Sequence, residues 1–465
     1  MTALLLAGPA GRLWAAAASS DDIAPSAADA PTSAALSAPW SEETDGRIRR
    51  ELAALRAELE AYRRGESDGS WLDGARADAI RALVDDVLAD ASTRTSLQSS
   101  DMVAGYDGKA FIGSPDGSHL LRIHGFLQAR WTMNHRQSTP PDEEDWTEGF
   151  SIRRARFFFD GTIETIGYRF RFTSGSDGRF SLDQAYADLP IDESGYIVRL
   201  GQVYLPLFRD DFVSGDGQLA VDSSVVNQLF NPGNSQGIQL RREWETIRFW
   251  LAFSDGLRSA NRSWDDPADA EYALTGRVEV RGGAGNWSRF DTYTSYPGEK
   301  TGWMVGFGAN WSGGAKQADD ATVDLAYFTL DGTIEGGGWN VSAMGVLAYD
   351  NLDLASGRAI DAGCVLQGGL FVAPTVELFA RYDLVFASDD RPGATEPFQG
   401  VTAGFTWYIA PNSQRLKCVA NLIYFPEATT ETLVEAVGGN FANQGLLPSD
   451  SGNQWAFQAQ VQMQF

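Results

Sequence analysis

The sequence predicts an all-β fold, a closed antiparallel transmembrane β-barrel of about 16 strands, preceded by an N-terminal α-helical, coiled-coil extension. From residue 119 to residue 465, apolar and polar residues alternate with a period of two, which places successive side chains on opposite faces of a strand. No run of 18 apolar residues occurs, so the sequence does not indicate a transmembrane helix. Aromatic residues make up 12% of the chain and glycine residues number 49, which fits the aromatic girdles and glycine-rich turns of barrels.

The first 41 residues carry two segments that we expect to lie outside the barrel. Residues 1–18 contain a short apolar run and then Ala15 to Ala18, a pattern similar to a remnant of an export signal, although no basic region precedes the run. Residues 19–41 are rich in Ala, Ser, Pro and Asp, a composition typical of a flexible linker.

Residues 42–65 have the pattern of a short coiled-coil helix. Apolar residues recur there at alternating spacings of four and three: Ile48, Leu52, Leu55, Leu59 and Tyr62. About two heptads are too few for a stable isolated dimer. Either a parallel trimer held together elsewhere contains this helix, or a single amphipathic helix lies on another surface. Residues 66–118 are predicted to hold a second amphipathic helix, from Trp71 to about Ala91, and a periplasmic connection to the barrel.

Residues 119–465 are expected to form the barrel, because the period-two pattern continues through this range. The predicted strands span, approximately, residues 120–131, 150–163, 166–175, 181–190, 196–204, 236–243, 246–254, 271–281, 301–311, 321–330, 338–350, 361–373, 375–387, 400–410, 414–425 and 454–465. An even number of strands near sixteen gives a lumen wide enough for water. In the last strand one face is apolar and the other is mostly glutamine. This strand ends on Phe465, as the closing strand of an outer-membrane barrel ends on an aromatic residue.

Connections between the predicted strands alternate between short and long, as expected for an outer-membrane barrel. Short periplasmic turns are expected at residues 161–167, 191–195 and 243–245, and long outer loops at residues 133–149, 254–270 and 426–453. The longest internal connection, Leu205 to Ser235, follows the fifth strand. These lengths predict the two ends of the barrel: short turns at one end and long loops at the other.

The basic residues are sorted by strand face, although the chain has a net charge of -25. A chain this acidic argues against a nucleic-acid partner. Opposite the apolar series lie Arg122, Arg130, Arg154, Arg156, Arg169, Arg171, Arg199, Arg241, Arg248, Arg277, Arg281, Arg381 and Lys417. An arginine facing lipid at mid-membrane costs about 2–4 kcal/mol, whereas a lumenal arginine offers forked donors to phosphate or carboxylate groups. We therefore predict that these residues line the pore and bind anions.

Carboxylates on the same strand faces leave a second interpretation of the charge pattern. Six of them are also predicted to face the lumen: Asp160, Asp188, Glu279, Asp324, Glu377 and Asp383. Cross-strand pairs with these residues would neutralise many of the arginines. The sequence thus allows an anion-preferring pore, or a weakly selective pore whose wall charges of both signs orient solutes.

Three segments of the barrel region have a distinctive pattern: Leu121–Gln128 (LRIHGFLQ), Phe150–Arg156 (FSIRRAR) followed by Gly161, and Leu200–Gln202 followed by Pro206. In this order they resemble the first strand, the second strand and the strand before the constriction loop of the phosphate-selective porins O and P. The resemblance implies a trimeric, sixteen-stranded channel in a Gram-negative outer membrane. It also implies a lumenal arginine ladder, with Arg154 and Arg156 as members, and a phosphate site near the constriction.

Leu205 to Ser235 occupies the position of the loop that commonly folds inward and narrows the channel in sixteen-stranded porins. Family members selective for phosphate place lysines at the constriction, whereas this segment contains no lysine. Its only cation is Arg209, and its acidic residues are Asp210, Asp211, Asp216 and Asp222. These carboxylates would repel phosphate unless they face away from the channel or bind a cation.

Few residues of this chain suit catalysis or metal binding. The three histidines are His119, His124 and His135. The chain has no GxSxG, HExxH or phosphate-cradling loop, so we expect no enzymatic activity and no cofactor. His124 should face the lumen, near Asp160 or Asp188. Cys364 and Cys418 lack a CxxC or histidine pairing; we expect small apolar residues facing lipid, and neither a metal site nor a disulfide.

These features together predict an outer-membrane porin of a Gram-negative cell. We expect a homotrimer that is surrounded by outer-membrane lipids, passes small anionic or neutral solutes by diffusion and holds its N-terminal extension in the periplasm. The alternative is an outer-membrane anchor that contacts the cell wall through residues 42–90, with a weakly selective or plugged barrel. Conductance separates the two hypotheses, because a plugged tether gives no conductance steps.

Overall fold

The structure, a computed structural model, describes Ala53 and residues 102–137, 145–175, 178–267, 269–316, 322–351, 358–391 and 393–465. The predicted signal remnant (1–18), linker (19–41), coiled coil (42–65, Ala53 excepted) and second helix (71–91) lie outside the described residues. Within the described part of the chain, no helix has the length and apolar character needed to cross a membrane.

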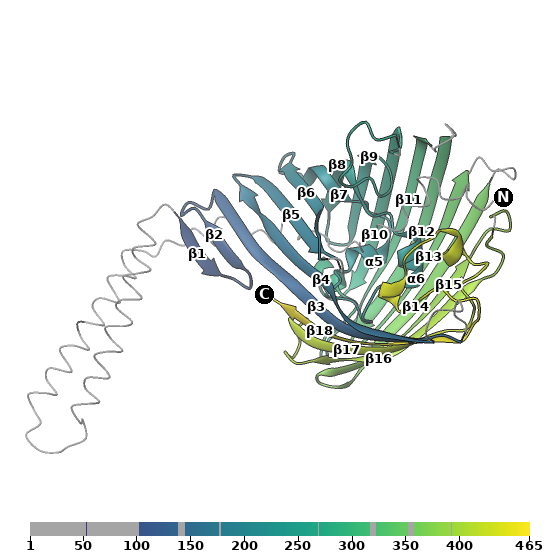
Figure 1. Ribbon diagram of the computed structural model, residues 1–465. Helices are drawn as coiled ribbons and strands as arrows, with labels where there is room; N and C mark the ends of the chain where they lie inside the picture. Colours follow the sequence, from purple (N-terminus) through teal and green to yellow (C-terminus); the bar gives the residue numbers. More distant parts are fainter. Residues whose placement is uncertain are drawn as a thin grey trace, which may run out of the picture. The chain divides into compact units, whose positions relative to one another are not determined.

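Sixteen antiparallel strands of the described chain form a closed barrel (Figure 1). They are β3 His119–His135, β4 Trp146–Ile163, β5 Ile166–Ser174, β6 Phe180–Pro190, β7 Tyr196–Tyr204, β8 Asn234–Glu243, β9 Ile247–Ser254, β10 Tyr272–Gly283, β11 Gly302–Lys316, β12 Thr322–Gly336, β13 Trp339–Asn351, β14 Ala359–Ala373, β15 Val376–Phe386, β16 Phe398–Tyr408, β17 Leu416–Phe425 and β18 Gln454–Gln464. Each strand pairs with the next, and β18 pairs with β3 to close the ring. The predicted strand number is confirmed, and each predicted strand overlaps one observed strand.

The barrel closes through a tight contact between its first and last strands. The N–H of Gly125 donates to the carbonyl of Phe465 at 3.0 Å, and the N–H of Phe465 donates to the carbonyl of Gly125 at 2.9 Å. A β-carbon at Gly125 would lie 2.3 Å from the carbonyl oxygen of Arg156 and 2.8 Å from the Phe465 ring. Glycine at position 125 therefore lets β3 approach β4 and the end of the chain this closely.

The polarity of the barrel is inverted relative to that of a soluble protein. Trp303, Val305 and Phe307 of β11 are exposed, whereas Met304 between them is fully buried. The largest fully buried side chains include Arg154, Arg156, Arg171, Arg209, Arg248 and Arg277. Because arginine is rarely fully buried in water-soluble proteins, this arrangement fits a wall with an apolar outer face and a charged inner face.

A smaller compact unit contains the described residues 102–122 and Gly161–Glu164, and the barrel contains Ile123–Asp160 and Thr165–Phe465. In the smaller unit, β1 (Val103–Tyr106) pairs antiparallel with β2 (Ala110–Gly113). The sequence predicts this stretch only as part of a connection, because two four-residue strands are too short to show a clear alternation.

Among the described residues, at least three connections fold into the barrel. The constriction segment, residues 205–233, contains α5 (Arg209–Phe212) and α6 (Val225–Phe230), and both helices lie within the ring of strands (Figure 1). Residues 426–453, the second inward loop, contain α7 (Leu433–Ala436) and the 3-10 turn η3 (Ala442–Gln444). Residues 284–301, the third, contain the 3-10 turn η2 (Trp287–Asp291). The predicted inward course of the constriction segment is confirmed.

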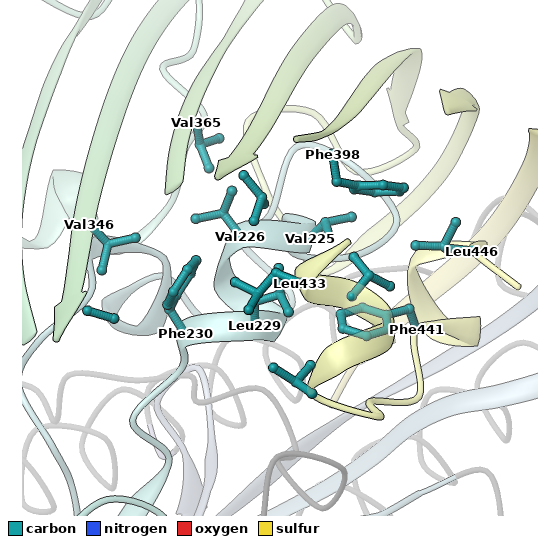
Figure 2. Close-up of a cluster of buried hydrophobic side chains, with 14 of the residues drawn as sticks. Val225, Val226, Leu229, Phe230, Val346, Val365, Phe398, Leu433, Phe441 and Leu446 are labelled. Atoms are coloured by element: carbon teal, nitrogen blue, oxygen red, sulfur yellow. The ribbon is translucent and has the colours of Figure 1, made fainter. Parts of the chain in front are cut away.

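The main apolar core therefore sits inside the barrel. Figure 2 shows Val226 and Phe230 of α6 together with Val365 of β14 and with Leu433 and Phe441 of the second inward loop. Residues 426–453 are predicted from the sequence only as an outer loop, whereas part of this loop packs inward on α6. Residues 284–301 also differ from expectation, because they join β10 to β11 at the end where the sequence predicts short turns.

Candidate functional site

The predicted pore-lining residues are buried on the inner face of the barrel. Twelve of the thirteen have this position: Arg130, Arg154, Arg156, Arg169, Arg171, Arg199, Arg241, Arg248, Arg277, Arg281, Arg381 and Lys417. On β9, for example, Arg248 is buried, whereas its neighbour Ile247 is exposed and its neighbour Phe249 is partly exposed. The structure thus places the residues as the alternation predicts.

Arg122 is the exception among the predicted pore-lining residues. It belongs to the smaller unit, where its Nη2 lies 3.0 Å from Oδ2 of Asp107 in the β1–β2 turn. Period-two alternation predicts on which face of a strand a residue lies. It does not predict whether that part of the strand belongs to the barrel. Arg122 is therefore not grouped with the buried arginines.

Buried charge is distributed unequally around the barrel. Strands β3–β8, here called the basic wall, bury eight arginines among the described residues: Arg130, Arg153, Arg154, Arg156, Arg169, Arg171, Arg199 and Arg241. The carboxylates of these strands that contact the buried arginines are Asp160 and Asp183, which are buried, and Asp188, whose side chain is 14% exposed. Strands β9–β18, the mixed wall, bury Arg248, Arg277, Arg281, Arg381 and Lys417 together with Glu279, Asp331, Glu335, Asp361, Glu377 and Asp383. Positive charge thus exceeds negative charge on the basic wall alone.

Asp188 on β6 binds two arginines of the basic wall. Arg199 Nε donates to Asp188 Oδ1 at 2.7 Å, and Arg241 Nη2 donates to Oδ2 at 2.8 Å. The Arg199 guanidinium also stacks 3.7 Å from the centre of the Tyr186 ring, a favourable cation–π arrangement. Asp188 therefore orients two guanidinium groups while it neutralises one charge.

Asp183 likewise lies close to two arginines, Arg156 and Arg171. Its Oδ2 lies 3.4 Å from Arg171 Nε and 4.0 Å from Arg156 Nε. Thr173 lies between these groups, because Arg156 Nε donates to its Oγ1 at 2.9 Å and its hydroxyl donates to Asp183. Arg156 and Arg171, on β4 and β5, are thus held side by side.

Asp160 joins a histidine to a third basic-wall arginine. His124 Nε2 lies 2.6 Å from Asp160 Oδ1, and Arg169 Nη2 lies 3.6 Å from the same oxygen. The His124 ring stacks on Phe158 with centroids 4.7 Å apart. The predicted position of His124 near Asp160 is confirmed.

The mixed wall is closer to charge balance. Arg277 donates from Nε to Glu279 at 2.8 Å and from Nη1 to Asp331 at 2.7 Å, and Arg248 donates to Glu279 at 2.5 Å. These bonds hold two guanidinium groups with two carboxylates. Cross-strand neutralisation, the second interpretation of the charge pattern, therefore describes this side of the barrel.

The constriction segment presents one aspartate to the basic wall. Arg153 donates from Nε and Nη2 to Asp222, the Nη2 contact being 3.1 Å. Arg154 Nη2 donates to Asp222 Oδ1 at 3.0 Å, and Arg130 Nη1 donates to Oδ2 at 3.2 Å. Burial alone would raise the pKa of Asp222, but Arg153, Arg154 and Arg130 hold this pKa well below its ordinary value of 3.8.

The other acidic residues of the constriction segment have neutral donors among their contacts. Tyr293 of the third inward loop donates its hydroxyl to Asp210 Oδ1 at 2.9 Å, and Asn231 donates to Asp211 Oδ1 at 2.7 Å. Asp216 accepts hydrogen bonds from Ser214 and from Gln464 of β18. Arg209, the only cation of the segment, donates to the carbonyl of Phe290. Asp222 thus differs from its acidic neighbours in meeting three arginines.

Local structure explains why Asp222 lies where it does. Ser224 caps α6, because its Oγ accepts a hydrogen bond from the N–H of Asn227 at 2.8 Å. The Ser223 N–H donates to Asp222 Oδ1 at 2.9 Å. Arg381 on the mixed wall donates to the carbonyl of Asp222 at 2.7 Å. The residue is therefore held from both walls of the barrel.

Arg153 is a site residue that the alternation argument misses. Arg153 and Arg154 are adjacent on β4 and both are buried, whereas Ile152 is exposed. Two successive inward side chains break strict alternation, as a β-bulge does. The signal in the sequence is the Arg-Arg pair itself, because one of two adjacent arginines in a membrane-spanning strand would otherwise face lipid.

Comparison with known proteins finds similarity in structure alone. No family model matches the chain, and no curated protein matches it. An anion-selective porin from Comamonas acidovorans superposes with a TM-score of 0.50 at 12% identity, over 74% of this chain and 99% of the porin. OmpF of Salmonella typhi, in complex with daunomycin, superposes with a TM-score of 0.50 at 9% identity, over 78% of this chain and 100% of OmpF. At these identities the likeness establishes the sixteen-stranded porin barrel as the fold of this chain. The resemblance to phosphate-selective porins stays a prediction.

Proposed function

We propose that this chain is an outer-membrane porin of a Gram-negative cell, through which small hydrophilic solutes diffuse and anions pass more readily than cations. The inverted polarity of the barrel supports this location, because an apolar exterior suits lipid and a charged interior suits water. The observation that carries the anion preference is the basic wall, where eight buried arginines meet Asp160, Asp183 and Asp188 of the same strands and Asp222 of the constriction segment.

The mechanism is a lowered electrostatic barrier for anions. Guanidinium N–H groups along the basic wall replace part of the water around an anion, and the charge is attractive in the low-dielectric surroundings of the barrel. Pairs such as Arg156 with Arg171 and Arg199 with Arg241 offer successive sites, so that no single site needs to hold an anion tightly. The mixed wall faces these arginine sites, so that an electric field runs across the pore from one wall to the other.

The favoured solute and the assembly are further parts of the proposal. The arginine-rich segment FSIRRAR supports an oxyanion such as phosphate or a carboxylate, and the fold supports a homotrimer in the outer membrane. The similar structure from Comamonas acidovorans is an anion-selective porin, but at 12% identity the preference proposed for this chain depends on its own arginines. The tether hypothesis concerns residues 42–90, of which only Ala53 is described.

The test compares two adjacent arginines of β8. Arg241→Gln removes a guanidinium that binds Asp188 on the basic wall. Arg242→Gln is the matched control, because the Arg242 guanidinium lies 4.4 Å from the centre of the Trp244 ring, whose side chain is exposed. In planar bilayers with the purified full chain, Arg241→Gln should lower the anion-to-cation permeability ratio and Arg242→Gln should leave this ratio near the wild-type value. Equal ratios in all three proteins would count against the basic wall as the source of selectivity.

A further inference from the structure

The second inward loop, residues 426–453, encloses a pocket of about 440 Å³. The floor of this pocket is apolar, because Val434, Phe441 and Leu446 line it and all three side chains are buried. Every described residue that lines the pocket belongs to this loop, so the pocket is distinct from the arginine sites of the basic wall. Its volume and its apolar floor are typical of sites that bind small organic molecules.

Hydrogen bonds within the protein hold the walls of the pocket. The N–H of Thr429 donates to the carbonyl of Ser449 at 2.8 Å, and the N–H of Ser449 donates to Thr429 Oγ1 at 2.7 Å. Beside this pair, Gln454 of β18 accepts the N–H of Leu447 at 2.7 Å and donates to the carbonyl of Leu447 at 2.8 Å. A ligand therefore meets a preformed pocket, and little of its binding energy is needed to order the loop.

Two carboxylates give the pocket a charge preference. Glu435 and Asp450 both line it and both are exposed. The N–H of Glu431 donates to Glu435 Oε2 at 2.8 Å, which fixes the position of this carboxylate. Arg136 reaches the same loop, where it donates to the carbonyl of Pro448 at 2.6 Å, but Arg136 does not line the pocket. The described lining thus has two negative charges and no positive charge, which favours a cationic ligand.

The floor of the pocket is also part of the apolar cluster that holds the constriction segment. Figure 2 shows Phe441 and Leu446 in one cluster with the side chains of α6. Gln444 of the second inward loop donates to Gln228 of α6 at 3.4 Å. A molecule on this floor therefore contacts side chains that pack in the same cluster as α6. If it binds only while α6 is docked, it stabilises the docked arrangement.

We propose that the second inward loop binds a small aromatic ammonium compound and that this ligand stabilises the constriction segment in its docked position. The aromatic ring of the ligand packs on the floor, where Phe441 offers a ring partner, and the ammonium group lies between Glu435 and Asp450. The proposal goes beyond the pore function, because the basic wall is proposed for anions and this pocket recognises the opposite charge.

Three probes that share an indole ring test the ligand class. Tryptamine is a cation at pH 7, tryptophol is neutral and indole-3-acetate is an anion. Their binding to the purified full chain in nanodiscs of zwitterionic lipid is measured by ligand-detected NMR, with empty nanodiscs as the blank. Tryptamine should bind about three- to tenfold more tightly than tryptophol, because it gains two exposed ion pairs of modest strength, and indole-3-acetate should bind most weakly. Equal affinities, or tightest binding of the anion, would overturn the proposal.

Substitutions of exposed side chains identify the pocket. Glu435→Gln combined with Asp450→Asn should abolish the advantage of tryptamine over tryptophol and leave tryptophol binding unchanged. Glu431→Gln is the matched control, because Glu431 is an exposed carboxylate of the same loop that does not line the pocket. The advantage should persist in this control. An advantage that survives in the double variant, or that is lost equally in Glu431→Gln, would place the binding elsewhere and overturn the proposal.

Limited proteolysis tests the effect on the constriction segment. At a tryptamine concentration of about one hundred times its Kd, the undocked fraction should fall about a hundredfold if the undocked state does not bind, so cleavage within residues 205–233 should slow. The double variant at the same concentration should show less protection. Binding that leaves the wild-type cleavage rate unchanged would overturn the link to the constriction segment. Neither assay requires a conducting pore, so failure of the proposed pore function and failure of this site are distinguishable.

Discussion

Replacing Phe230 by alanine should loosen the constriction segment without opening the barrel. Phe230 is fully buried in the apolar cluster inside the barrel (Figure 2). The Phe230 ring packs closely against β14, because a β-carbon at Gly363 would lie 2.9 Å from Cε2 of Phe230 and 2.7 Å from Cγ1 of Val226. The strand-to-strand hydrogen bonds that close the barrel do not involve this side chain.

The expected magnitude follows from the loss of a buried phenyl ring. A Phe→Ala change in a packed core costs about 3–5 kcal/mol, and this cost falls on the docking of α6. Because about 1.4 kcal/mol corresponds to a factor of ten, the undocked fraction of α6 should rise by about two to four orders of magnitude. The contacts of Asp222 with the basic wall remain, so the displacement should be confined to the α6 end of the segment.

Single-channel recording is the assay for Phe230→Ala, with limited proteolysis of residues 205–233 as a second measure. We expect larger or noisier conductance steps and faster cleavage. Phe405→Ala is the matched control, because Phe405 on β16 is 45% exposed and faces outward. If Phe230→Ala has the conductance and the cleavage rate of the wild type, the apolar cluster does not hold the constriction segment in place.

Three further predictions concern the basic wall and its closure. Asp222 has a lowered pKa, so its contribution to docking is complete above its unfolded value of 3.8 and is lost as pH falls through the lower folded value. Acidification from about pH 5 to about pH 2 should thus increase cleavage within residues 205–233, and equal cleavage at both pH values would argue against this ion cluster. Gly125→Ala should lower the thermal unfolding midpoint, since overpacking costs about 1–3 kcal/mol, whereas Gly345→Ala, with open space at its β-carbon, should lower it less. Arg154→Ala combined with Arg156→Ala should reduce the anion-to-cation permeability ratio in bilayers. An unchanged ratio would mean that these arginines only support the wall.

The sequence predicts the strands well because alternation is a local property. Each strand of β3–β18 must present one face to lipid and the other to the interior, so its residues carry the pattern independently of distant contacts. The same logic places twelve of the thirteen predicted basic residues on the inner face and brings His124 to Asp160. It fails at Arg153, where the alternation breaks, and at Arg122, which belongs to the smaller unit.

The inward loops are harder to predict because their packing depends on partners that are distant in the sequence. Leu433 and Phe441 have no period of their own, and their burial follows from α6, some two hundred residues earlier in the chain. The position of Tyr293 likewise depends on a residue distant in the sequence, because its hydroxyl donates a hydrogen bond to Asp210. The contact of Asp222 with three arginines depends on the inward course of the constriction segment and on the break in alternation at Arg153. The sequence pattern alone therefore shows an acidic loop, but not the arginines that bind its aspartate.

The reversal potential of the wild-type pore in a salt gradient tests the central claim most directly. The purified full chain is inserted into a planar bilayer with unequal potassium chloride concentrations on the two sides. An excess of arginine on the basic wall predicts a reversal potential with the sign of a chloride-preferring pore, and a smaller preference at high ionic strength because salt screens the wall. A reversal potential with the sign of a potassium-preferring pore would contradict the account.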